Sequence, residues 1–201
     1  MDAHKEEKFE KRKTWKQRFD SATQGNFGYV VYALLGVFIA FMLNQGMGIA
    51  LHTDLPVVAV VSGSMVHDSS TPTVFYKWLE DNLGYNKTYI DSWPVQDGFL
   101  IGDLPIIEGA KNYSVGDVVV YSIPGQSVPI IHRIIKINSD STYTTKGDHN
   151  DRSIVFGGGY SEYAIKPSWV HGKVIFIIPK LGYFKVILTD IWMQIVTGGR
   201  S

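Results

Sequence analysis

The feature that most constrains this chain is a run of 17 uncharged residues from Phe27 to Leu43, FGYVVYALLGVFIAFML. As an α-helix this run would extend over about 25 Å, and the apolar stretch GMGIAL that follows it lengthens the helix toward the ~30 Å core of a bilayer. Tyr29 and Tyr32 lie near one end, where aromatic side chains favour the membrane–water interface. We therefore predict a transmembrane helix over residues 26–50.

A cleaved signal peptide and a buried core helix both fit the apolar run less well. The apolar core of a signal peptide is usually about 7–15 residues long and follows a short charged region. Here the run is longer, and the charged segment before it, residues 1–25, is long as well. A buried core helix would need a surrounding layer, and nothing else in the chain looks able to supply one.

The charges before the run predict its orientation. Basic residues cluster ahead of it, and no comparable cluster follows. Because basic loops tend to stay in the cytoplasm, we place residues 1–25 there and residues 51–180 on the other side of the membrane, in the cell or endoplasmic-reticulum membrane. The basic residues in question are Lys5, Lys8, Lys11, Arg12, Lys13, Lys16 and Arg18.

Short apolar runs separated by turn residues follow the helix. The segments 55–61, 117–123, 129–137 and 170–178 are rich in Val and Ile, which favour strands. The alternation around Tyr143–Thr145 predicts a hairpin partner for the third of them. Strands at this spacing predict a mainly β domain, a barrel or sandwich, over residues 51–180.

Residues 66–114 form a less regular insertion in that pattern. Apolar residues at helical spacing predict a short helix over residues 73–83, and the rest is typical of loops. Asn86 and Asn112 each begin a triplet that matches the N-glycosylation sequon. The sequence leaves open whether either asparagine carries a glycan, and it leaves open the role of the insertion.

The C-terminal segment, residues 181–201, predicts an amphipathic helix over residues 181–196. Apolar side chains recur there at spacings of three and four, with Lys185 and Asp190 off that face. A second membrane span would bury both charges, at about 2.5–3.5 kcal/mol each near the bilayer centre. We therefore expect this helix to lie on the membrane surface or on the β domain, with a second span as the alternative.

Composition excludes several classes of site. The chain has no cysteine, so thiolate zinc sites, disulfides and cysteine nucleophiles are impossible. Lysine and arginine together equal aspartate and glutamate in number, so no basic field indicates nucleic acid as a partner.

Three polar features remain as candidates for chemistry. Ser62-Gly63-Ser64-Met65 ends an apolar run, His132 sits inside IIHRII, and Asp148 and Asp151 lie in the turn KGDHNDR. Each is also consistent with an ordinary structural role: a turn, a histidine on a half-exposed strand face, and a solvated hairpin turn. The last could also ligate a metal through Asp148, His149 and Asp151, but it offers too few convergent ligands. Together they supply the serine, histidine and carboxylate of a catalytic triad.

At these residues the chain resembles the type I signal peptidases, in the archaeal and endoplasmic-reticulum branch. The matching motifs, in family order, are SGSM at 62–65, GDVVVY at 116–121, IIHRI at 130–134, TKGDHN at 145–150 and VHGKVIFIIPKLGY at 170–183. They cover most of residues 25–183. In the bacterial branch a lysine base precedes the arginine, and here His132 holds that place.

The resemblance implies a role for each matching residue. Ser64 would be the nucleophile and His132 the general base, while the Ser62 hydroxyl and the Ser64 N–H would form the oxyanion hole. Asp148 matches the aspartate of the Gly-Asp motif, and Asp151 corresponds to a second family aspartate, at a shorter spacing. Either aspartate could orient His132.

Two features depart from the family pattern. The family often has proline two positions after the methionine, and here that residue is His67, which is an alternative candidate for the base. The insertion 66–114 is also longer than in compact members, and it could form a lid, a substrate clamp or an accessory surface.

The resemblance implies a membrane-anchored serine endopeptidase that cleaves signal peptides from exported preproteins, without a metal or another cofactor. Its expected partners are those signal peptides, membrane lipid and the protein-translocation machinery. Val58, Val60 and Ile131 are the expected walls of shallow substrate pockets. Two other classes stay open: a catalytically inactive β domain that binds peptides or protein partners, and a metal-dependent or structural envelope protein.

Overall fold

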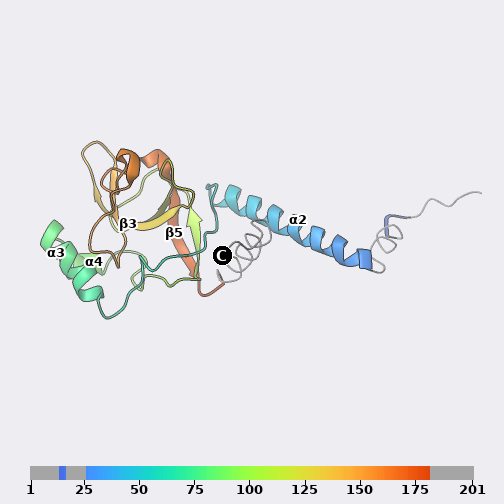
Figure 1. Ribbon diagram of the computed structural model, residues 1–201, viewed down its shortest axis with the longest axis horizontal. Coiled ribbons are helices and arrows are strands. Elements are labelled where there is room, and N and C mark those ends of the chain that lie inside the picture. The colour runs from blue at the N-terminus through green and yellow to red at the C-terminus, as the bar shows by residue number, and fades with distance from the viewer. Residues whose placement is uncertain (1–13, 17–25, 182–201) are drawn as a thin grey trace, which may run out of the picture. The chain divides into compact units, whose positions relative to one another are not determined.

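The computed structural model of the protein describes residues 14–16 and 26–181 (Figure 1). The expected N-terminal segment 1–25 and C-terminal helix 181–196 therefore lie almost entirely outside the described residues. The chain divides into two compact units, residues 1–46 and 47–201. Helix α2 (Asn26–Ala50) confirms the predicted apolar helix, and over Gly28–Ala50 its length and composition are sufficient to cross a membrane.

The second unit is built on one antiparallel sheet, which confirms the mainly β prediction. Its strands lie in the spatial order β1-β5-β2-β3-β4, so that the last strand in sequence returns between the first two. Three of the predicted strands and the predicted hairpin partner are present. The strands are β1 (Leu104–Glu108), β2 (Val118–Tyr121), β3 (Ile130–Ile137), β4 (Tyr143–Lys146) and β5 (Val170–Ile178).

The register of β3 matters most for the site. His132 lies opposite Val119 of β2, and Arg133 lies opposite Lys146 of β4. Successive side chains of a strand point to opposite faces of the sheet, so His132 and Arg133 look in opposite directions. The side chains of His132 and Arg133 therefore contact different groups of residues, one group on each face of the sheet.

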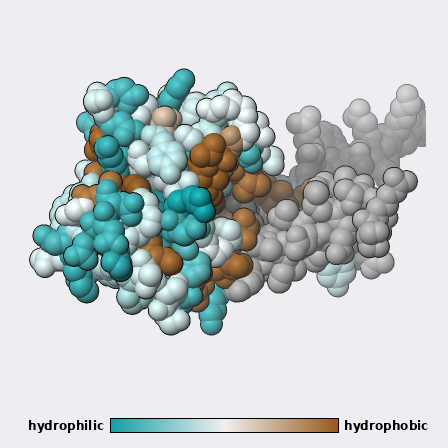
Figure 2. Space-filling view, turned by 60° about the vertical axis from the view of Figure 1, so that its left-hand side comes forward, coloured by the Kyte–Doolittle hydropathy of each residue, from teal (hydrophilic) through white to brown (hydrophobic). Residues whose placement is uncertain are grey.

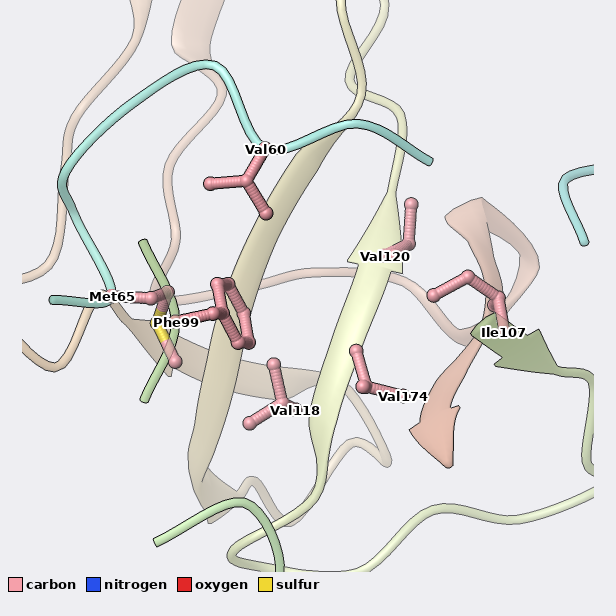
Figure 3. Close-up of a cluster of buried hydrophobic side chains, with 7 residues drawn as sticks. All are labelled: Val60, Met65, Phe99, Ile107, Val118, Val120 and Val174. Atoms are coloured by element: carbon pink, nitrogen blue, oxygen red, sulfur yellow. The ribbon is translucent and has the colours of Figure 1, made fainter. Parts of the chain in front are cut away.

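Apolar side chains fill both sides of this sheet. In the cluster drawn in Figure 3, Val118 and Val120 of β2 pack with residues from the chain before β1, namely Val60, Met65 and Phe99. Tyr121 and Ile134 belong to a second cluster, with the neighbouring Val119 of β2. Met65 is almost completely buried, so it anchors the segment that carries Ser62 and Ser64.

The first predicted strand differs from expectation. Residues 55–61 run beside β1 and exchange backbone hydrogen bonds with it, but only the isolated bridge between Val57 and Ile106 is strand-like. Pro56 and Pro105 lack the N–H groups that a regular ladder needs. Strand β1 was not predicted, because a proline within a short apolar run argues against a strand. The sheet tolerates Pro105 because β1 lies at its edge.

Short helices make up much of the insertion 66–114. A π-helix, η1 (Pro72–Lys77), continues directly into α3 (Trp78–Leu83), so the predicted helix over 73–83 is confirmed. Helix α4 (Lys87–Ile90) follows, and Phe75, Leu79, Ile90 and Trp93 pack with Ile135 of β3. Two 3-10 helices, η2 (Gly157–Gly159) and η3 (Pro167–Trp169), lie between β4 and β5.

The outer surface of the β domain is mixed. Figure 2 shows hydrophobic atoms in several places among hydrophilic ones on one face of the molecule. Large apolar side chains that stay exposed on this domain include Val61, Leu100, Ile101, Val128, Val155 and Phe176.

Candidate active site

A cavity of about 400 Å³ brings together three residues that the motifs selected. Ser62, Ser64 and His132 all line it, together with Asn150. Two of the three expected pocket walls, Val60 and Ile131, line it as well, whereas Val58 packs against the first apolar cluster instead. The remaining wall is mostly apolar and includes Val61, Phe99, Val128, Ile130, Ile154 and Phe156.

The segment that carries the two serines is a tight turn, in which the Val66 N–H donates to the Gly63 carbonyl at 3.1 Å. The Ser64 hydroxyl lies 3.2 Å from the Ser62 hydroxyl. The Ser64 carbonyl accepts a hydrogen bond from the His149 N–H at 2.9 Å. No hydrogen bond within the described part of the chain uses the Ser64 N–H, so that group is free to bind an oxyanion.

Gly147 shows how closely the serine segment approaches His132. A Cβ atom built on Gly147 would lie 2.7 Å from the Ser64 carbonyl oxygen and 2.9 Å from the His132 Nε2 atom. Nothing larger than glycine fits between these two groups. Ser64 and the Nε2 side of His132 therefore meet at one small space, even though the two side chains are not hydrogen bonded in the free protein.

Replacing Gly147 by alanine should stop catalysis without unfolding the domain. The new methyl group would press on the Ser64 backbone, the His132 ring and the Asn150 side chain, and a misplacement of about 1 Å can cost ~10²-fold in rate. We expect kcat to fall by about 10²-fold or more while the thermal transition remains cooperative. Gly125→Ala is the matched control, because nothing lies within 4 Å of its Cβ position, although its positive φ adds some local strain.

The carboxylate that contacts His132 is Glu162, which the sequence analysis missed. The His132 Nδ1–H donates to Glu162 Oε1, and both side chains are buried. The same oxygen accepts from the Tyr121 hydroxyl at 2.5 Å, and Oε2 accepts from the Ile154 N–H at 2.7 Å. A carboxylate oxygen that accepts from the Nδ1–H can hold the imidazole in one tautomer.

Tyr121 reports the electrostatics of this pocket. Burial, followed by the nearby charge of Glu162, raises the pKa of the Tyr121 phenol well above its ordinary value. The phenol therefore stays protonated and can only donate to Glu162. This leaves the carboxylate as the acceptor for both the tyrosine and the histidine.

Asp148 has different partners. Its carboxylate takes a forked pair of bonds from Arg133, at 2.9 Å from Nε and 2.6 Å from Nη2, and a third from His67 Nε2 at 2.9 Å. Burial alone would raise the pKa of Asp148, but the Arg133 charge, with the hydrogen bonds from His67 and Arg133, lowers it overall. Asp148 is therefore an ionised partner of Arg133, and no hydrogen bond joins it to His132 in the described structure.

Asp151 lies at the surface. Its side chain is 78% exposed and reaches Arg152 at 3.5 Å. It makes no hydrogen bond or ion pair with His132 among the residues described. The turn that contains Asp148, His149 and Asp151 also forms no cluster of three or more metal-ligating side chains within the described part of the chain.

The alternation of side chains accounts for these positions. Lys146 lies opposite Arg133, so Asp148, two residues further on, belongs to the face of Arg133. Thr145 and Gly147 belong to the other face, where Thr145 bonds to Tyr121 and Gly147 approaches His132. An aspartate at 148 therefore faces the arginine rather than the histidine.

Lys146 is a buried lysine close to the site. Burial lowers its pKa to about 8, and its ammonium group donates to the carbonyls of Val74 and Gly147, both at 3.0 Å. It also lies over the Trp78 ring, 5.1 Å from the ring centroid. These contacts fasten β4 to the insertion, and Lys146 does not line the cavity of Ser64.

A second Ser-His-Asp set lies elsewhere on the same domain. The Ser122 hydroxyl is 2.8 Å from His171 Nε2, and His171 Nδ1 is 2.7 Å from Asp54. The Ser122 N–H, however, donates to the Trp169 carbonyl at 3.0 Å, so it cannot serve as an oxyanion donor without breaking that bond. Contacts among a serine, a histidine and an aspartate are therefore not enough to identify an active site. Ser64 differs from Ser122 because its N–H has no hydrogen bond among the described residues, the Ser62 hydroxyl lies beside it, and it lines a cavity.

A serine and a histidine in one apolar cavity, with a buried carboxylate on the far nitrogen of the histidine, are the parts that serine hydrolases combine. This arrangement, on a β domain that follows an apolar helix, is consistent with a serine hydrolase.

Comparison with known proteins narrows this class. No family model matches the chain. It is 27% identical to the signal peptidase complex catalytic subunit SEC11 of Eremothecium gossypii, over 78% of this chain and 81% of that protein. It is 28% identical to SEC11 of Komagataella phaffii, over 75% and 77%, and 26% identical to sec11 of Neurospora crassa, over 87% and 84%. The chain is therefore similar to signal peptidase catalytic subunits over three quarters or more of its length, as its motifs predict.

Proposed function

We propose that this protein is a membrane-anchored serine endopeptidase that removes signal peptides from exported preproteins. The observation that carries the proposal is the cavity shared by Ser64 and His132, with Glu162 buried behind the histidine. The relatives are catalytic subunits by name, which supports an active enzyme over an inactive peptide-binding domain.

The proposed reaction begins when substrate enters the cavity. The Ser64 hydroxyl turns from Ser62 toward His132 Nε2, a change that apo active sites commonly need. His132 takes the proton as Ser64 attacks the scissile carbonyl. Glu162 holds Nδ1–H and stabilises the imidazolium that forms.

The tetrahedral intermediate then needs donors for its oxyanion. The Ser64 N–H and the Ser62 hydroxyl supply them, and one such donor is typically worth ~10²–10³ in rate. His132 returns its proton to the leaving amine, and water hydrolyses the ester on Ser64 by the same route. The chain's own residues thus account for each proton transfer.

The apolar cavity walls favour a substrate with small apolar residues next to the scissile bond. Val60, Ile131 and Phe99 narrow the cavity from the sides, and the extended segment 57–61 leaves backbone groups near Ser62. An extended peptide end could pair with this backbone while alternate side chains enter the apolar wall. Signal peptides of exported proteins end in such segments.

Location and partners complete the proposal. Helix α2 would anchor the enzyme, with residues 1–25 in the cytoplasm and the catalytic domain across the membrane, next to membrane lipid. Anchoring concentrates enzyme and substrate on one surface. The relatives are subunits of a complex by name, which supports further subunits, and the translocation machinery, as partners.

The test is cleavage of a preprotein by the purified full-length chain in detergent, with the new N-terminus mapped by mass spectrometry. We expect one cut, directly after the signal peptide. Cuts scattered through the mature part, or an intact preprotein in the presence of the copurifying subunits, would contradict the proposal.

A further inference from the structure

His67 stands where the family often has proline, and its contacts link two segments of the proposed active site. It belongs to residues 62–67, here called the nucleophile segment. Its Nε2–H donates to the Asp148 carboxylate at 2.9 Å, in residues 145–150, here called the Gly-Asp segment. The same two segments are joined a second time by the bond from the His149 N–H to the Ser64 carbonyl. The Asp148 N–H, 3.3 Å from Met65 Sδ, makes a third link, and the His67 bond is the one among these three in which both partners are side chains.

Asp148 is itself held rigidly to β3. The Arg133 guanidinium binds it through two nitrogens and also donates to the carbonyls of Gly116, at 2.8 Å, and Pro94, at 2.7 Å. Arg133 is completely buried. Because Arg133 follows His132 directly on β3, the position of Asp148 is fixed relative to the proposed base.

The His67 ring is also packed in place. Its centroid lies 5.2 Å from that of Phe75 in η1, and only 13% of its side chain is exposed. Gly98 lies against its other side, where a Cβ would come within 2.8 Å of the ring. The ring therefore has little freedom, and its hydrogen bond to Asp148 is preorganised.

We propose that His67 is a positioning residue, which sets the place of Ser64 relative to His132 through Asp148 and Arg133. This inference rests on the proposed function, since it assigns Ser64 and His132 their roles. The chain of contacts runs from Ser64 through Met65 and Val66 to His67, and then to Asp148, Arg133 and the adjacent His132. His67 is not the base, because its Nε2 is engaged by Asp148 and it does not line the cavity.

The same contacts give the insertion a role. Residues 66–114 supply Phe75, which packs on His67, and the Pro94 and Val95 carbonyls, which hold Arg133. The insertion thus supports the positioning unit from the face of the sheet opposite His132.

The experiment compares His67→Phe with His67→Gln in the preprotein assay. Phenylalanine keeps a ring against Phe75 but removes the donor to Asp148, whereas glutamine keeps a donor. We expect His67→Phe to lower kcat by about 10- to 100-fold with KM changed by less than about threefold, and His67→Gln to recover most of the loss. An unchanged kcat for His67→Phe, or a glutamine variant as slow as the phenylalanine one, would overturn the proposal.

Tyr85→Phe is the matched control. The Tyr85 hydroxyl also ties the insertion to β3, by donating to the Ile135 carbonyl at 3.0 Å, but it has no contact with Asp148. We expect its loss to lower stability as much as the loss of the His67 bond, and to leave kcat unchanged. A drop in kcat equal to that of His67→Phe would show a merely structural effect and would overturn the proposal.

A second measurement does not depend on cleavage. The His149 amide, which donates to the Ser64 carbonyl, should exchange with solvent deuterium at least about tenfold faster in His67→Phe, while the sheet amides of β2 and β3 keep their rates. An unchanged His149 exchange rate would overturn the positioning role. If the wild-type chain cleaves no preprotein, the proposed function fails, and the exchange comparison still decides whether His67 positions this segment.

Discussion

Ser64→Ala is expected to abolish preprotein cleavage, with a fall in kcat of about 10⁴-fold or more. The reason is that Ser64 supplies the nucleophile in the proposed reaction. Ser62 lies 3.2 Å away from the Ser64 hydroxyl, on the side of the proposed oxyanion donor. Purified variants assayed on one preprotein in detergent, with stability followed by thermal unfolding, check this result.

Ser122→Ala provides the matched control for that variant. Ser122 is also hydrogen bonded to a histidine that contacts an aspartate, but its N–H is used by the Trp169 carbonyl. The variant should cleave at the wild-type rate. Cleavage that survives in Ser64→Ala and disappears in Ser122→Ala would exchange the two assignments.

Glu162→Gln is expected to lower kcat by about 10²- to 10⁴-fold with little change in KM. An amide of the same shape can still accept from the Ile154 N–H, but its NH2 group can turn toward His132 Nδ1. The histidine would then carry its proton on Nε2, where it could no longer accept one from Ser64. Steady-state kinetics on the same preprotein measure the effect.

Asp151→Asn is the control for Glu162→Gln. Both variants neutralise a carboxylate that lies beyond β4, but Asp151 is exposed, and its one hydrogen-bond partner among the described residues is Arg152. Its replacement should change kcat by less than about twofold. A large loss in Asp151→Asn with full activity in Glu162→Gln would assign the orienting role to Asp151, one of the two aspartates that the resemblance leaves open.

Much of the fold follows from local patterns. The strands β2, β3 and β5 are runs of valine and isoleucine, and α2 is an uncharged run of membrane-spanning length, so each could be recognised from a short window. Strand β1 could not, because Pro105 interrupts a pattern that only its edge position tolerates. A local pattern does not predict a segment whose conformation depends on its neighbours in space.

The site shows the same division. The motifs select Ser62, Ser64 and His132, because each lies at the end of an apolar run or within one, and the folded chain brings the three to one cavity. Glu162 carries no sequence signal, since it lies outside the recognised motifs, between β4 and β5 and thirty residues after His132. Only the folded chain brings it behind the imidazole.

The partner of Asp148 depends on the register of one hairpin. In the β3–β4 hairpin, a basic pair Arg133 and Lys146 shares one face, and the period of two puts Asp148 on that face too. Asp148 therefore pairs with Arg133, and the carboxylate that contacts His132 comes from Glu162. No local pattern determines this register, so the sequence leaves Asp148 and Asp151 as equal candidates.

The most direct test of the Ser64–His132–Glu162 unit is the tautomer of His132, read by NMR from protein with ¹⁵N-labelled histidine. At a pH where the ring is neutral, we expect the proton on Nδ1, with Nε2 free to accept from Ser64. Glu162→Gln should shift the proton to Nε2, whereas Asp151→Asn should leave it on Nδ1. A His132 tautomer that ignores Glu162 and responds to Asp151 would contradict the assignment.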